Sequence, residues 1–167
     1  MLGSYTAIEN SMLNQILNGE ESDTGFEKCQ YLDIDKSWQL IHFLLCKNTE
    51  NGKPPMGYVV PMSDENELDF GYSDARIFYL TKQQVKEASD YLNSLSDDTL
   101  KNMYDFKEMQ ENGVYPIDKN EPDTGLYEYI YFYLAAVRKF FCKRQKKNIQ
   151  LSSGSVKDGS HFIDESR

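Results

Sequence analysis

The densest apolar run in the chain lies between residues 31 and 47, YLDIDKSWQLIHFLLCK, and it predicts a helix that is enclosed on most of its surface. Asp35 is suited to cap this helix, because its carboxylate can accept hydrogen bonds from amides two and three residues later. Lys36 would then open the helix and Cys46 would lie near its end. His42 falls on the same buried side as the apolar positions at helical spacing, which are Trp38, Leu40, Ile41, Leu44 and Leu45.

Five further segments show helical periodicity or residues that begin a helix. The clearest follows Thr81, because Thr81 and Gln84 can form a capping box in which each side chain satisfies a backbone amide. Ser96 can cap the next short helix, and Asp123 or Thr124 can cap the longest one. These predicted helices span about residues 11–17, 82–95, 97–104, 106–112 and 126–145.

Four short segments, residues 2–8, 57–60, 75–80 and 148–151, are rich in residues that favour strands. Polar or Pro/Gly-rich stretches separate the predicted elements and are expected to be connections. The pattern therefore predicts a single domain of mixed helix and strand. The Ser/Gly-rich segment 152–167 cannot bury enough apolar surface to order itself unless residues 161–163 dock on the domain.

The formal net charge of −9 argues against a general affinity for nucleic acid, because phosphate binding depends on a positive field. One segment departs from this balance, with six basic residues between Arg138 and Lys147. These cations can complement the dipole at the end of the longest helix, or they can form a patch that binds an anion, a nucleic acid or a partner.

Three widely spaced cysteines match neither a disulfide framework nor the closely spaced pairs that hold zinc, and reduced thiols are expected. No apolar run approaches the roughly 20 residues that cross a bilayer, and no secretory signal opens the sequence. We therefore expect a cytoplasmic protein without a membrane segment.

Four motifs in order, LDIDKSWQLIHFLL, GYSDARIFYLTKQQVKEASDYL, NGVYP and LYEYIYFYLAAVRKFF, resemble the YfbM-like family of bacterial proteins of unknown function. The resemblance covers residues 2 to about 151 and places a YfbM-like domain at 1–151, with 152–167 as a C-terminal extension. It implies an α+β or α/β fold in which helices flank a small mixed sheet of about four strands. It implies no reaction. The family often has a tryptophan shortly after the Tyr-Pro, where this chain has residues 117–119, IDK.

Candidate residues for chemistry are few. Asp33 and Asp35 form a D-x-D that could help to hold a divalent cation, but a helix start explains them as well, and no metal is predicted. His42 could act as a general base if it faced a cleft beside a carboxylate, whereas its spacing favours a hydrogen-bonded core position. Since no nucleophile motif or Gly-rich phosphate loop is present, we assign no catalytic residue and no cofactor.

Arg76, just after Tyr72, could bind a carboxylate or phosphate with its planar fork, or it could pair with an acidic residue at a strand edge. Tyr115, before Pro116, could line a pocket or pack in a turn. A pocket near the central helix would draw on Asp33, Trp38, His42, Tyr72, Arg76 and Tyr115.

Three functions stay open at this stage. The first is a non-enzymatic protein-interaction module, because twelve tyrosines and an acidic surface suit a partner with a basic surface. The second is an enzyme or small-ligand binder with the pocket just described. The third is nucleic-acid binding through residues 138–147.

Overall fold

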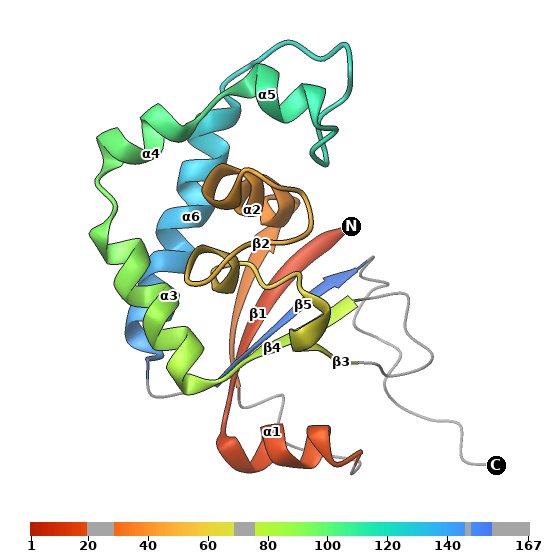
Figure 1. Cartoon of the computed structure of the whole chain (residues 1–167), viewed down its shortest axis with the longest axis vertical. Coiled ribbons are helices and arrows are strands. Elements are labelled where there is room, and N and C mark those ends of the chain that lie inside the picture. The colour runs from red at the N-terminus through yellow and green to blue at the C-terminus, as the bar shows by residue number, and fades with distance from the viewer. Residues whose placement is uncertain (20–28, 69–75, 146–147, 155–167) are drawn as a thin grey trace, which may run out of the picture.

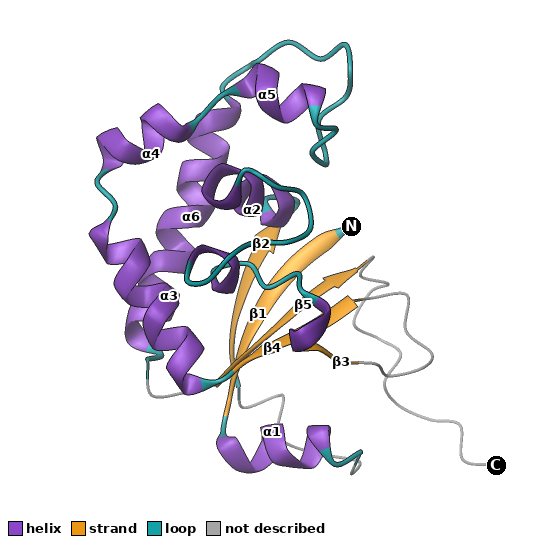
Figure 2. Ribbon diagram, in the orientation of Figure 1, coloured by secondary structure: helices purple, strands orange, loops and turns teal. Residues whose placement is uncertain are grey.

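A five-stranded sheet organises the structure, a computed structural model that describes residues 1–19, 29–68, 76–145 and the backbone of 148–154. The strands lie in the order β2-β1-β5-β4-β3, and each neighbouring pair is antiparallel. The longer helices lie together on one side of the sheet, and α1 lies near one end of it (Figures 1 and 2). The strands are β1 (Leu2–Ile8), β2 (Gln30–Asp35), β3 (Glu67–Leu68), β4 (Arg76–Leu80) and β5 (Asn148–Gly154).

The α+β class is confirmed, but the sheet is antiparallel rather than mixed. The strands predicted at 2–8, 75–80 and 148–151 are present as β1, β4 and β5, although residue 75 lies outside the described residues. β5 continues through Gly154 and lies between β1 and β4, at the centre of the sheet. Residues 152–154, which we had placed in the C-terminal extension, therefore belong to the sheet, and residues 155–167 lie outside the described part of the chain.

One strand prediction was wrong, and two strands, β2 and β3, were not predicted. The segment 57–60 does not form a strand; it overlaps a 3₁₀ turn, η2 (Met56–Tyr58), and leads into buried Val59 and Val60. A short apolar run cannot be distinguished from a buried turn by periodicity alone. β2 was missed because its alternation of buried Ile34 with exposed Asp33 merges in sequence with the apolar run that follows.

The helices are α1 (Asn10–Leu17), α2 (Trp38–Cys46), α3 (Lys82–Ser94), α4 (Asp97–Met103), α5 (Phe106–Glu111) and α6 (Leu126–Lys143); a second 3₁₀ turn is η3 (Asp64–Asn66). The capping box of Thr81 and Gln84 is present, and the Ser96 hydroxyl accepts a hydrogen bond from the Thr99 amide at 3.1 Å. Asp123 closes the start of α6, because its Oδ1 accepts from the amides of Gly125 and Leu126, each at 3.2 Å.

Asp35 is not the N-cap that we predicted. It ends β2 with φ of 48°, and α2 begins at Trp38 after Ser37. Its carboxylate is engaged with another element, since Oδ2 accepts the Tyr129 hydroxyl hydrogen bond at 2.8 Å. The residue thus joins the end of β2 to α6 instead of starting a helix.

The enclosure predicted for α2 is confirmed, because every residue from Leu40 to Leu45 is buried. Gly3 of β1 lies against Trp38 at the start of this helix, and Tyr5 of the same strand is fully buried and donates a hydrogen bond to the Val59 carbonyl at 2.6 Å. The Tyr5 ring also meets Phe141 of α6 edge-on, with centroids 5.5 Å apart. Tyr5 therefore connects the sheet, the η2 segment and α6 inside one core.

Two glycines allow the segment after α2 to fold back against the helix. A Cβ at Gly57 would lie 2.1 Å from the backbone oxygen of Gly52. A Cβ at Gly52 would lie 2.5 Å from Cys46 Sγ and 3.0 Å from His42 Cε1. Neither position has room for a side chain.

Gly57→Ala should therefore destabilise the fold strongly, because the obstacle is backbone and cannot rotate away. Gly19→Ala is a matched control, since Gly19 has φ of 70° but nothing lies within 4 Å of a new Cβ, so only left-handed strain of about 1–2 kcal/mol applies. In urea unfolding, we expect Gly57→Ala to lose at least about 1 kcal/mol more than the control. Equal losses in the two variants would contradict this packing.

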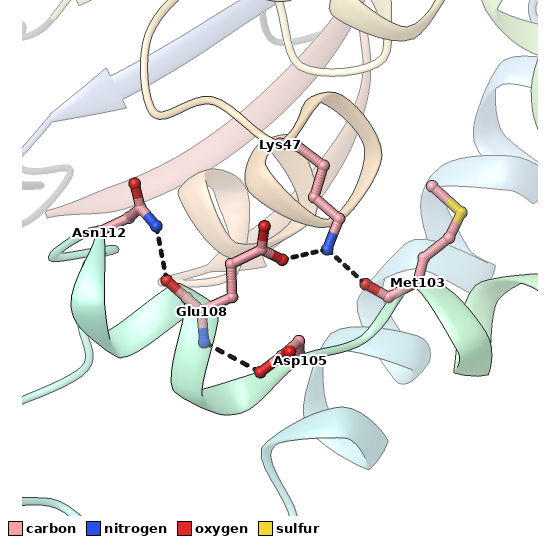
Figure 3. A network of polar contacts seen from close by, with 5 residues as sticks. All are labelled: Lys47, Met103, Asp105, Glu108 and Asn112. Carbon is pink, nitrogen blue, oxygen red and sulfur yellow. Dashed lines mark hydrogen bonds and ion pairs between the residues drawn. The ribbon is translucent and has the colours of Figure 1, made fainter.

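Lys47 fixes α4 and α5 to the end of α2 (Figure 3). Its Nζ donates to the Met103 carbonyl at 2.7 Å and to Glu108 Oε2 at 2.5 Å. The Glu108 amide donates in turn to Asp105 Oδ1 at 2.9 Å, which caps α5. Lys47 itself has φ of 53°, a backbone conformation that costs a non-glycine residue about 1–2 kcal/mol.

Comparing Lys47→Ala with Lys47→Gly should separate the stabilisation from the ammonium contacts from the cost of the left-handed backbone. Both variants lose the ammonium group, but only glycine relieves the left-handed backbone. We expect Lys47→Gly to be more stable than Lys47→Ala by roughly 0.5–1 kcal/mol in urea unfolding, after allowing for the greater entropy of glycine in the unfolded chain. A Lys47→Gly variant that is less stable than Lys47→Ala would show that the backbone at this position is not strained.

Candidate functional site

His42 occupies the hydrogen-bonded core position that its spacing predicted. Its side chain is 1% exposed, and Nδ1 lies 2.9 Å from the Val60 carbonyl oxygen. Because a carbonyl can only accept, Nδ1 carries the proton and Nε2 keeps its lone pair. Nε2 is buried without a hydrogen-bond partner. Burial lowers the His42 pKa, and the Val60 hydrogen bond opposes this shift more weakly.

Cys46, one turn after His42, shares these surroundings. Burial raises the pKa of its thiol to about 12, which keeps the sulfur protonated near neutral pH. A nucleophilic cysteine needs a thiolate, and a general base needs access to a proton on the substrate. The neutral imidazole and the protonated thiol both lie in the packed contact with Gly52, so their surroundings favour core packing over catalysis.

Trp38 and Tyr115 are the two predicted site residues that the structure brings together. Their rings stack with centroids 6.0 Å apart, and the Tyr115 amide donates to Gln39 Oε1 at 2.7 Å. The Tyr115 hydroxyl accepts a hydrogen bond from the Met1 amino group at 2.8 Å. The pair thus holds the turn before Pro116 against the start of α2.

Asp33 and Arg76 lie on different strands and have separate roles. Asp33 Oδ1 accepts from the Asp35 amide at 2.7 Å, within β2. Arg76 forms a two-pronged pair with Glu67, from Nε at 2.9 Å and Nη2 at 2.6 Å, and this hydrogen bonding lowers the pKa of Glu67. The strand-edge ion pair that we weighed for Arg76 is therefore present. Tyr72 lies outside the described residues.

The basic segment is partly engaged within the fold. Arg138 donates from Nη2 to the Leu95 carbonyl at 3.1 Å and pairs with Asp97 at 3.7 Å. The Arg144 guanidinium lies 5.7 Å from the centre of the Phe140 ring. Lys139 and Lys143 are exposed on α6, and residues 146–147 lie outside the described part of the chain.

A group of aromatic and acidic side chains, which we call the acidic tyrosine cluster, surrounds the start of α6: Tyr104, Tyr127, Asp97, Asp98 and Asp123. The Tyr104 and Tyr127 rings lie 5.3 Å apart, and the Tyr104 hydroxyl donates to Asp123 Oδ2 at 3.0 Å. Burial and then this hydrogen bond raise the Tyr104 pKa. The Tyr127 pKa is raised by burial and then by neighbouring groups that include Tyr131, Asp97 and Asp98.

Sequence reasoning missed this cluster. The spacing of Tyr127 and Tyr131 by four residues on a predicted helix was visible, and their rings do stack at 6.0 Å. Tyr104 and Asp97 reach α6 only through the packing of α4, which Lys47 helps to fix. No local sequence signal reports such a contact.

Next to the cluster, the outer face of α6 carries a shallow, mostly apolar depression of about 640 Å³. Ala135 and Ala136 are the smallest side chains that line it, and Phe132, which is 67% exposed, lies beside them. Tyr127 of the cluster lines one edge of the depression, and we call the other six lining residues the α6 stripe: Glu128, Tyr131, Phe132, Ala135, Ala136 and Lys139.

The buried His42 should make stability fall on mild acidification. Because its folded pKa is below the ordinary value of about 6.5, the unfolded chain binds a proton more readily than the folded chain. The free energy of unfolding should decrease as the pH falls below about 6.5, by at most about 1.4 kcal/mol per pH unit, down to the folded pKa. Urea titrations between about pH 7.5 and 5 measure this slope.

His42→Asn can keep a donor for the Val60 carbonyl and removes the titration. The variant should be less stable overall, because it leaves a gap in the core, but it should lose the His42 part of the slope. A wild-type slope that persists unchanged in His42→Asn would assign the effect to other groups.

Comparison with known proteins agrees with the architecture. Residues 1–151 match the family described as a domain of unknown function, DUF1877. Protein YfbM of Escherichia coli strain K12 is 27% identical over 131 residues, which cover 70% of this chain and 73% of that protein. The crystal structure of YfbM from Escherichia coli, described as a protein of unknown function, superposes with a TM-score of 0.71 at 20% identity, covering 91% of this chain and 99% of that one.

In the described ranges, no helix combines the length and the apolar character that a membrane crossing requires. The resemblance to the YfbM-like family noted from the sequence motifs is confirmed by the family match, which spans all the described helices and most of β5. The chain belongs to the DUF1877 family of YfbM-like proteins.

Proposed function

We propose that this chain is a non-enzymatic protein-interaction module of the bacterial cytoplasm, and that it binds a partner with a basic surface through the acidic tyrosine cluster. The observation that carries the proposal is the contact of Tyr104 with Tyr127 on a surface that also holds Asp97, Asp98 and Asp123. Aromatic rings and carboxylates are gathered there from α4, α6 and the segment before α6.

This combination suits arginine and lysine side chains. The face of a tyrosine ring attracts a cation, and a carboxylate pairs with a guanidinium by charge-assisted hydrogen bonds. The tyrosine rings also provide contact area with few rotatable bonds, which lowers the entropy lost on binding. The net charge of −9 would add long-range attraction for a basic protein.

The two alternatives have less support from the described residues. A pocket at the Trp38/His42 helix would need Asp33, His42 and Arg76 to converge. Instead, His42 is buried, Asp33 is bonded within β2, and Arg76 is paired with Glu67 at the other side of the sheet. Nucleic-acid binding would rest on a basic segment in which Arg138 is already paired with Asp97.

The test is capture of partners from the native host by the tagged wild-type chain and by two variants with the same charge change. Asp98→Lys places a cation in the cluster, whereas Glu111→Lys places one on exposed α5. We expect a basic protein to be retained at near-stoichiometric amounts by the wild type and by Glu111→Lys. Asp98→Lys should retain it at least about tenfold less, because an attractive ion pair becomes a repulsive one.

Two results would contradict the proposal. One is a wild-type chain that retains no basic protein at moderate salt. The other is equal retention by Asp98→Lys and Glu111→Lys, which would show that only the total charge matters.

A further inference from the structure

The α6 stripe has an internal symmetry in its sequence. Glu128 and Lys139, Tyr131 and Ala136, and Phe132 and Ala135 are three pairs of residues, and all three are centred on the same point between residues 133 and 134. When two copies of a helix pack antiparallel about a two-fold axis, residues related in this way lie opposite each other. In such a dimer, the two residues of each pair would face each other across the interface, one from each copy.

The three pairs are complementary in size and in charge. Each of the two large rings, Tyr131 and Phe132, would lie opposite an alanine, and the alanines are the small residues that line the depression. Glu128 would lie opposite Lys139, an acid opposite a base. Two copies of one surface can fit together only if the surface is complementary to itself, and this stripe meets that condition.

The stripe also differs in charge from the rest of the chain. The stripe holds one acid, Glu128, and one base, Lys139. Its formal net charge is therefore zero, whereas that of the chain is −9. A basic partner would gain little from a neutral face, whereas a second copy would form two ion pairs on it. Glu128 and Lys139 lie about 16 Å apart along α6 and on the same side of the helix, so both pairs can form in one contact.

We propose that the α6 stripe is the interface of a symmetric homodimer in which the two α6 helices pack antiparallel. Phe132 of each copy fills the depression over Ala135 of the other, and Glu128 of each copy pairs with Lys139 of the other. This assembly does not depend on the proposed binding of a basic protein, because Asp98 and Tyr104 lie outside the stripe. Tyr127, which belongs to the cluster and also lines the depression, lies with Tyr131 at the border of the two surfaces.

Reversal of charge tests the pairing directly. Glu128→Lys gives a chain with lysines at both positions, and Lys139→Glu gives a chain with acids at both positions. Each variant alone should dimerise at least about tenfold more weakly than the wild type, since both ion pairs of the dimer become repulsive. Sedimentation velocity from micromolar to about millimolar concentration measures this change.

Mixing the two variants should restore association. In the mixed dimer each lysine faces a glutamate, so both contacts become attractive again. A heterodimer about as stable as the wild-type homodimer would support the pairing, and thermal melts of each variant would show that both are folded. A wild-type chain that is monomeric throughout the range, or variants that do not associate when mixed, would overturn the proposal.

Phe132→Ala tests the apolar contact of the proposed dimer interface, and Tyr31→Ala is the matched control. Both side chains are highly exposed, at 67% and 60%, but Tyr31 lies on β2, outside the stripe. Phe132→Ala should weaken dimerisation at least about tenfold with little change in the melting of the monomer, while Tyr31→Ala should leave dimerisation unchanged. Equal effects in the two variants would also overturn the proposal.

Discussion

The structure depends on the complete enclosure of α2. A helix that is apolar on nearly every side can only be stable where other elements cover it, and here β1, the η2 segment after α2, α4 and α6 pack against it. This segment can approach closely because Gly52 and Gly57 have no side chains at the contact. The same enclosure explains the state of His42, which is neutral, bonded to Val60 and shielded from solvent.

The sequence predicted well those features that depend on neighbouring residues. The capping box at Thr81, the cap at Ser96 and the burial of His42 all follow from local spacing, and all are present. Features decided by distant contacts were missed. Asp35 has the chemistry of an N-cap, yet it bonds Tyr129, 94 residues away, with its backbone in the left-handed region.

The same distinction between local and distant contacts applies to the surface residues. A count of tyrosines and acids indicated a role in recognition, but it could not say which of them meet. The structure places Tyr104 of α4 against Tyr127 of α6 beside three aspartates, and it leaves a neutral apolar stripe farther along the same helix. One helix therefore carries two faces of different chemistry, one suited to a basic protein and the other to a second copy of the chain.

The position of β5 has a consequence for how the chain folds during synthesis. Among the described strands β5 comes last in the sequence, yet it lies between β1 and β4. Until residue 154 has left the ribosome, the antiparallel pair β1–β2 and the antiparallel pair β3–β4 have no strand to join them, and each pair presents an unpaired edge. We expect the domain to complete its sheet only after residues 148–154 have been synthesised, so the nascent chain would until then depend on the cell to keep these edges apart.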